Sequence, residues 1–387
     1  MHLEMDNRKR ELVTTGYIAF MLSGLCAISS GVIVSILQEK YGFSYSISGT
    51  LLSIMSVGNM LASFAAGILP GRIGQRRTVA ILCAGYFVGY MLMAFLGNVG
   101  VLMGAFLLVG IAKGCTINNC TTLVGNNSQD RTRGMSLMHA CYATGAMVCP
   151  FIISGLLCVN QSLPMAGIAV GGLALWLVFM RAGLPREPVA QADGRTTDFS
   201  FMRSGYFWLL TALIFCQNAG ETAVTGWLVT YYKDSGILSG YLSAYTVTIM
   251  WGATLIARLI IAFVFKIQNT FRATAVMGVG CVLMYLWLLA AHTPVSAVLA
   301  LFAFAFAMAG VNPVGMAGIG RHMTSTSVGV LLPVSGLGQI IMPYIIGLVA
   351  DGTSLQFAMA LNVIPCAGIL IISLALLRCG DHSDQAI

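Results

Sequence analysis

Charged side chains are scarce in this sequence. Only 9% of its 387 residues are Asp, Glu, Lys or Arg, whereas an ordinary soluble protein has about 25%. Too few charges remain to cover a water-facing surface, which excludes a soluble globular enzyme. The 58% hydrophobic content excludes a disordered chain. We therefore expect a polytopic protein embedded in the lipid bilayer.

Catalytic, cofactor-binding and metal-binding patterns are also lacking. The sequence has no H-E-x-x-H motif, no phosphate-binding G-x-x-x-x-G-K-[ST] motif and no C-x-x-C pair. Its eleven cysteines lie mostly inside apolar runs, where we expect packing residues rather than metal ligands or disulfides. The net charge of +7 is spread between the runs and not gathered in one patch, which argues against nucleic-acid binding. We predict no enzyme activity, no cofactor and no metal.

Long apolar runs fill most of the chain. A membrane-spanning helix needs about 20 apolar residues, and twelve runs of roughly that length or more are present. Each is predicted to be one helix, because the runs are continuous and do not alternate as the strands of a barrel do. The runs cover residues 12–37, 46–69, 78–97, 100–124, 134–158, 163–182, 205–231, 238–265, 273–291, 295–320, 324–350 and 354–378.

The basic residues between the runs predict the orientation. With a cytoplasmic N-terminus, 16 of the 20 Lys and Arg residues fall on the cytoplasmic side, and only Lys40 and Lys233 fall outside. One missed helix would scramble this asymmetry. We predict twelve transmembrane helices in the cell membrane, with both the N- and the C-terminus cytoplasmic.

The chain divides at a polar loop after the sixth run. We predict an N-terminal six-helix bundle over 1–182, a cytoplasmic linker over 183–204, and a C-terminal six-helix bundle over 205–387. Because a solute site between two halves of one chain needs no second subunit, we expect a monomer.

The two halves resemble each other at an offset of 193 residues. Gly145 and Pro150 in the fifth run recur as Gly338 and Pro343 in the eleventh. Asn119 in the fourth run and Asn312 in the tenth have the same offset. Such matches indicate a parallel repeat of six helices, with a solute site near mid-membrane where the halves meet.

The loop after the second run carries a family motif. Residues 67–77 read Gly-Ile-Leu-Pro-Gly-Arg-Ile-Gly-Gln-Arg-Arg, which resembles the G-x-x-x-D-R-x-G-R-R loop of the major facilitator superfamily. Gly71 stands where the family has Asp. The resemblance implies an all-α membrane protein, in which twelve transmembrane helices form two pseudo-symmetric six-helix bundles that transport solutes by alternating access. It also implies a gating or structural role for four loop residues, Arg72, Gly74, Arg76 and Arg77.

Two further stretches narrow the resemblance. Asn118-Asn119, Arg133-Gly134 and Leu137-Met138-His139 are similar to a pattern of the fucose-permease-like sugar transporters. The stretch from Gly336 through Pro343 to Asp351 is similar to the matching pattern in their eleventh helix. This resemblance implies a sugar as the solute and protons as the coupling ion.

One helix combines an acid with amides. Glu221 is the only acid well inside an apolar run, and it shares a helical face with Gln217, Asn218 and Thr225. Amides donate and accept hydrogen bonds, which suits a hydroxyl-rich solute. A carboxyl in apolar surroundings takes up a proton more readily, so Glu221 is predicted to bind solute and couple protons. In the alternative, Glu221 pairs with Lys113 or Arg258 and only holds the fold.

Four further polar residues in the apolar runs are candidates, because polar groups inside a bilayer usually serve a purpose. Lys113 is predicted either to bind an anionic solute or to form a gate with Glu221. Asn119 and Asn312 are predicted to bind solute, with helix–helix hydrogen bonding as the alternative. His139 is a candidate proton relay, with a packed core histidine as the alternative.

These observations predict a secondary active transporter for a small polar solute, with a sugar and proton symport as the expected choice. Uniport, in which the solute moves without a coupled ion, is the alternative to proton symport, because the first half has no buried acid. Two other functions stay open, namely efflux of amphipathic compounds and a transport-inactive solute sensor.

Overall fold

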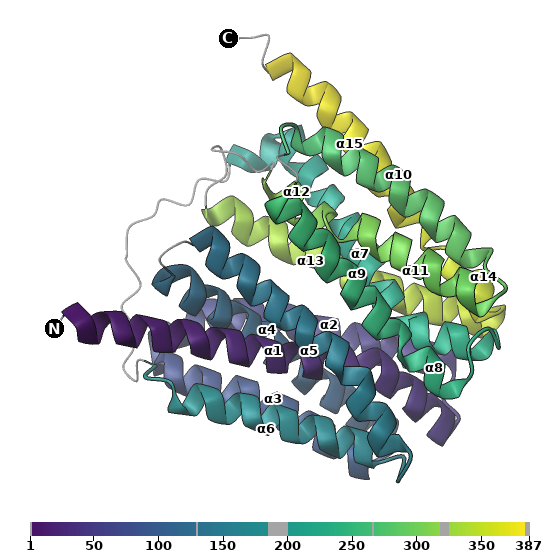
Figure 1. Cartoon of the computed structure of the whole chain (residues 1–387), viewed down its shortest axis with the longest axis horizontal. Coiled ribbons are helices and arrows are strands. Elements are labelled where there is room, and N and C mark those ends of the chain that lie inside the picture. Colours follow the sequence, from purple (N-terminus) through teal and green to yellow (C-terminus); the bar gives the residue numbers. More distant parts are fainter. Residues whose placement is uncertain (1, 129–130, 185–199, 265–266, 318–324, 384–387) are drawn as a thin grey trace. The chain divides into compact units, whose positions relative to one another are not determined.

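The computed structural model describes residues 2–128, 131–184, 200–264, 267–317 and 325–383. Within these ranges the chain is helical, and the helices run in two groups that follow one another along the sequence (Figure 1). The chain divides into one unit over 1–193 and a second over 194–387. This division falls inside the linker predicted over 183–204, most of which (185–199) lies outside the described residues.

Six long helices make up the residues of the first unit that the structure describes. Their ends follow local signals: Ser44 and Asn98 cap the starts of the second and fourth helices through side-chain oxygens, and Pro164 lies in the first turn of the sixth. The helices are α1 (His2–Tyr41), α2 (Tyr45–Ile73), α3 (Gln75–Phe95), α4 (Val99–Asn127), α5 (Arg131–Leu157) and α6 (Leu163–Arg181).

The described part of the second unit has nine helices for the six apolar runs of its sequence, and a short 3-10 turn, η1 (Ser200–Arg203), precedes them. Asn269, Thr293 and Ser354 cap three of the helix starts. The helices are α7 (Gly205–Asp234), α8 (Gly240–Ala244), α9 (Thr246–Phe263), α10 (Thr270–Leu289), α11 (Pro294–Met308), α12 (Val311–Ala317), α13 (Ser325–Gly352), α14 (Leu355–Ala360) and α15 (Val363–Ser383).

Three runs predicted as single helices are broken in the structure. The run over 295–320 becomes α11 and α12, and the run over 354–378 becomes α14 and α15. In both cases a proline, Pro313 or Pro365, lies in the first turn after the break, where its missing N–H leaves no intrahelical bond unmade. The run over 238–265 is interrupted at Tyr245, between α8 and α9.

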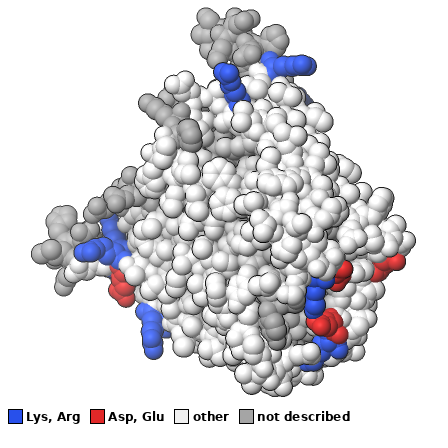
Figure 2. Space-filling model, turned by 45° about the vertical axis from the view of Figure 1, so that its right-hand side comes forward, with Lys and Arg blue, Asp and Glu red and all other residues white. Residues whose placement is uncertain are grey.

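The helices are long and apolar enough for a membrane. Ten of them, counted over the described residues, meet the length and hydropathy expected of a membrane span. Helix α7 is not among these ten, although it has 30 residues, because amides, a carboxylate and hydroxyls interrupt its apolar sequence. The face drawn in Figure 2 is mostly uncharged, with few lysine, arginine, aspartate or glutamate side chains on it.

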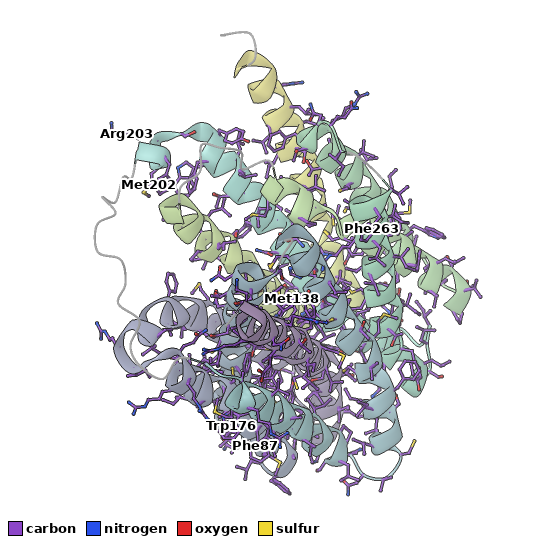
Figure 3. All side chains as sticks on the ribbon, turned by 60° about the vertical axis from the view of Figure 1, so that its left-hand side comes forward. Phe87, Met138, Trp176, Met202, Arg203 and Phe263 are labelled. Atoms are coloured by element: carbon purple, nitrogen blue, oxygen red, sulfur yellow. The ribbon has the colours of Figure 1, made fainter. Side chains whose placement is uncertain are left out.

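Aromatic side chains join helices within the first unit. Trp176 of α6 donates a hydrogen bond from Nε1 to the backbone oxygen of Ala80 in α3, over 2.8 Å. Figure 3 labels Trp176 of α6 and also Phe87, which lies on α3 as Ala80 does. The buried hydroxyls of Tyr86 and Tyr90 bond Ser23 and Ser29 of α1 over 2.8 and 2.7 Å. These bonds satisfy polar groups that lipid would leave unpaired.

Two glycines related by the repeat make the same kind of contact. A Cβ atom at Gly145 of α5 would overlap the carbonyl oxygen of Met21 in α1. A Cβ atom at Gly338 of α13 would overlap the carbonyl oxygen of Phe215 in α7. In each unit a small residue therefore lets two helix backbones approach closely, which is the usual basis of helix packing in lipid.

The Gly338 contact yields a stability prediction. Gly338→Ala should lower the thermal midpoint of the purified protein, because overpacking typically costs about 1–3 kcal/mol. Gly336→Ala is the matched control on the same helix, since a Cβ atom there meets nothing within 4 Å. The measurement is size-exclusion chromatography after heating. Equal midpoints for the two variants would contradict the close contact.

Candidate functional site

Helix α7 carries a stripe of polar side chains. Gln217, Glu221 and Thr225 are spaced by four residues and share one face of the helix. Gln217 is only 1% exposed, whereas Glu221 and Thr225 are half-buried. The Thr225 hydroxyl donates to the backbone oxygen of Glu221 over 2.8 Å. The carboxylate of Glu221 is thus held in the body of a membrane helix, where an acid is costly unless it has a partner.

That partner is the side-chain amide of Gln217, which is bonded in turn to a second side-chain amide. The Nε2 group of Gln217 donates to Oε2 of Glu221. The Oε1 atom of Gln217 accepts in turn from Nδ2 of Asn312 in α12, over 3.0 Å. Asn312 is the second residue of α12, directly after the break that separates α12 from α11. Three of the predicted site residues therefore form one chain of hydrogen bonds that ends on a carboxylate.

Asn218 has a different environment from its neighbour. Its Nδ2 group donates to the backbone oxygen of Ser335 in α13 over 3.1 Å. Further along, Nε1 of Trp227 donates to the backbone oxygen of Pro343 over 3.1 Å, and the Trp227 side chain is fully buried. Asn218 and Trp227 therefore connect α7 with α13, a helix that contains Pro333 and Pro343.

The repeat-related Asn119 lies in the first unit and is 5% exposed. Its Nδ2 group donates to the backbone oxygen of Cys115 over 2.9 Å. Its Oδ1 atom accepts from Nε2 of Gln75 in α3 over 3.1 Å. In this arrangement Asn119 serves as a hydrogen bond between helices, which is the alternative that the sequence left open.

Lys113 and His139 also belong to the first unit. Lys113 is half-buried on α4, six residues before Asn119. His139 is exposed on α5, and its ring meets Phe20 of α1 edge-on at 5.6 Å between centroids. A pairing of Lys113 with Glu221 would join the two units and stays a prediction, as does the proton relay at His139.

The motif loop between α2 and α3 is a tight turn. Gly74 has φ of +85°, in the region that only glycine adopts without strain. Arg76 donates from Nη2 to the backbone oxygen of Met180 at the end of α6, over 3.0 Å. Arg72 and Arg77 are exposed. Gly74 and Arg76 thus hold the ends of three helices together, while a gating role of the loop stays a prediction.

Two residues that support the candidate site were not among the predicted site residues, although the sequence contained a signal for each. Gln75, which holds Asn119, was visible as a member of the motif loop. Asn362, between α14 and α15, is fully buried and donates from Nδ2 to the backbone oxygen of Gly220, over 3.3 Å. An asparagine in the apolar run 354–378 was the available signal. It lies against the residue that precedes Glu221 and supports that part of α7.

The comparisons with known proteins bear on the whole chain. A sequence profile of the Major Facilitator Superfamily matches residues 16–336. The chain belongs to this superfamily. It is a multi-pass membrane transporter of a small solute and not an enzyme.

Two solved structures and one curated relative are similar to this chain. It is similar to a mutant of the nucleoside transporter NupG, with a TM-score of 0.79 and 14% identity over 96% of this chain and 99% of that one. It is also similar to a bacterial homologue of the human lysosomal transporter Spinster, in an inward-facing and occupied conformation. That match has a TM-score of 0.73 and 10% identity over 96% of both chains. At these identities the likeness establishes the fold alone.

A gallate transporter of Pseudomonas putida is 27% identical over 121 residues. The matched part is 31% of this chain and only 27% of that relative. The transporter fold is therefore established across the chain, whereas the identity of the solute is not.

The position of Asn119 yields a second prediction. Asn119→Leu should lower the thermal midpoint of this transporter, because it leaves the Gln75 amide without its partner, at a cost of about 1–3 kcal/mol. Asn118→Leu is the matched control, since the side chain of Asn118 donates to the Gly114 oxygen of its own helix. A variant Asn119→Leu with unchanged stability and weakened solute binding would instead assign Asn119 to the solute site.

Proposed function

We propose that this chain is a secondary active transporter that moves a small, hydroxyl-rich solute by alternating access, with Glu221 as the proton-coupling group. The observation that carries this proposal is the hydrogen-bonded chain of Asn312, Gln217 and Glu221. Amides inside an apolar helix bundle offer donors and acceptors to hydroxyl groups. A carboxylate beside them is the group that can gain and lose a proton during the transport cycle.

A sugar is the first candidate solute. The stretches around Asn119, His139 and Gly338 support this choice, since they resemble the pattern of the fucose-permease-like transporters. The half-buried ends of the amide chain also suit a neutral polyol better than an amphipathic compound, which would favour a more apolar surrounding.

We further propose that the protein acts as a monomer in the cell membrane with both termini in the cytoplasm. The distribution of Lys and Arg between the apolar runs supports this orientation. In the transport cycle the six-helix halves would alternate in opening to either side, and solute and proton occupancy would shift the balance between the two states.

Counterflow in proteoliposomes tests the proposal. Vesicles preloaded with one unlabelled compound are offered the same compound in labelled form, across neutral hexoses, nucleosides and gallate. Accumulation of a neutral hexose supports the sugar assignment. No counterflow for any of these, from protein that is monodisperse, would favour efflux of amphipathic compounds or a transport-inactive sensor.

Proton coupling gives a prediction at Glu221. Glu221→Gln should keep counterflow but abolish accumulation driven by an inward pH gradient, because an amide cannot carry the proton. The measurement compares both assays in the same vesicles. Glu39→Gln is the control, since Glu39 is an exposed acid at the end of α1. Gradient-driven accumulation that survives in Glu221→Gln would remove Glu221 from the coupling mechanism.

A hydroxylated aromatic acid is the second candidate solute. Two observations favour it, namely the half-buried Lys113 on α4 and the similarity to a gallate transporter. In this alternative Lys113 binds the carboxylate of the solute.

The two solutes separate at Lys113. If the solute is anionic, Lys113→Met should raise the half-saturation concentration for gallate by about tenfold or more, because a hydrogen bond to a charged group is worth about 1.5–3 kcal/mol. Lys113→Arg should restore most of the affinity. Equal effects of Lys113→Met on gallate and on a neutral hexose would instead show that Lys113 supports the fold or pairs with Glu221.

A further inference from the structure

The two hydrogen bonds that link Asn312, Gln217 and Glu221 run in one direction, because each amide donates toward the carboxylate. An ionised carboxylate only accepts hydrogen bonds, so the amide that faces it must present its NH2 group. Gln217 does so toward Glu221, and its oxygen therefore faces away and accepts from Asn312. With Glu221 ionised, both amides in the chain point their donors toward the carboxylate. The last polar atom, Oδ1 of Asn312, is then an acceptor.

We infer that Gln217 and Asn312 form a relay that reverses its hydrogen-bond polarity when Glu221 takes up a proton, which converts the terminal group of Asn312 from an acceptor into a donor. A protonated Glu221 carries an O–H group that needs an acceptor. The oxygen of Gln217 can serve as that acceptor, because the amide of Gln217 already faces the carboxyl of Glu221. Once Gln217 turns its oxygen toward Glu221, its NH2 group faces Asn312, which must turn in the same way.

The burial of the three side chains favours a concerted reversal. Gln217 is 1% exposed, so water cannot replace a mismatched partner at the middle of the relay. Two oxygens or two NH2 groups facing each other there would leave a buried polar group unsatisfied, which costs more than reorienting the amide. Asn312 and Glu221 are half-buried, so the two ends of the relay can exchange with solute and with protons.

Among the described residues of the second unit, Gln217 is the side chain that bonds this carboxylate. Among the described residues of that unit, the hydrogen-bond partners of Glu221 are Gln217 at its carboxylate and Thr225 at its backbone oxygen. Arg258 of α9 bonds the backbone oxygen of Ala309 over 3.4 Å. The other titratable or charged side chains described on the elements that pack against α7 are Arg203, Tyr245, Tyr344, Asp351, Cys366 and Arg378.

This inference rests on the proposed function and adds a mechanism to it. Glu221 would hold the proton, and Asn312 would touch the solute. Gln217 would be a positioning residue that transmits the protonation state of Glu221 to Asn312. The solute would then be bound by a terminal acceptor in one protonation state and by a terminal donor in the other, so that affinity depends on pH without contact between proton and solute.

The test is infrared difference spectroscopy of the full-length purified protein between acidic and alkaline pH, with no solute present. The wild type should show the band of a protonated carboxyl that is absent in Glu221→Gln, together with side-chain amide bands that change with it. In Gln217→Met the carboxyl band should persist while the amide bands of the relay disappear. Asn312→Leu should remove only part of them.

A matched control and a transport readout complete the test. Asn218→Met removes a neighbouring amide that bonds Ser335 and not the relay, so its amide difference bands should equal those of the wild type. In counterflow of the transported hexose or of gallate, the half-saturation concentration of the wild type should change with pH by about twofold to tenfold, the size set by one neutral hydrogen bond. Gln217→Met should remove this pH dependence. None of these variants changes Lys113, so that their differences cannot come from the loss of that lysine.

The outcomes separate the relay from the proposed function. A carboxyl band that responds to pH with unchanged amide bands in the wild type would overturn the relay and leave Glu221 as the proton site. The same amide bands in Gln217→Met and the wild type would also overturn it. A protein without a pH-dependent carboxyl band from Glu221 would overturn both the relay and the proton-coupling part of the function.

Discussion

A polar side chain inside a bilayer has no water to bond, and the rest of this structure depends on how each such group finds a protein partner. Several of the polar groups in the helices therefore also join one helix to another. In the first unit, Asn119 on α4 is held by Gln75 on α3. In the second, Asn218 and Trp227 on α7 bond backbone oxygens of α13.

The repeat makes the difference between the two units informative. Asn119 and Asn312 occupy equivalent positions in the sequence, yet their partners differ. Asn119 is satisfied by a neighbouring glutamine and by its own helix. Asn312 lies at a break between α11 and α12 and joins a chain that leads to Glu221. The first unit thus uses its asparagine to stabilise helix packing, whereas in the second the equivalent residue bonds Gln217, which in turn bonds the only acid well inside an apolar run.

Much of the fold followed from the sequence because the physical requirement is local. A span needs a continuous apolar run, and twelve runs accounted for the helical segments. Pro313 beside Asn312 indicates a local helix break, and the structure has one at Gly310. The breaks at Tyr245 and Asn362 were not predicted, because an apolar run does not itself mark where its helix is interrupted. The candidate residues were identified because they are polar in an apolar context, but polarity alone did not distinguish Asn218, which bonds α13, from Gln217, which bonds Glu221.

By itself, the sequence determined the membrane class, the helical runs, the likeness of the two halves and the short set of polar residues inside them. These are properties of composition and spacing, and they hold whatever the helices pack against. Only the tertiary structure decided which polar residues meet, because hydrogen-bond partners such as Gln217 and Asn312 are 95 residues apart and come together through the packing of α12 on α7. The same packing decided that Gly145 and Gly338 are points of backbone contact, since the need for a small residue arises only from the neighbouring helix.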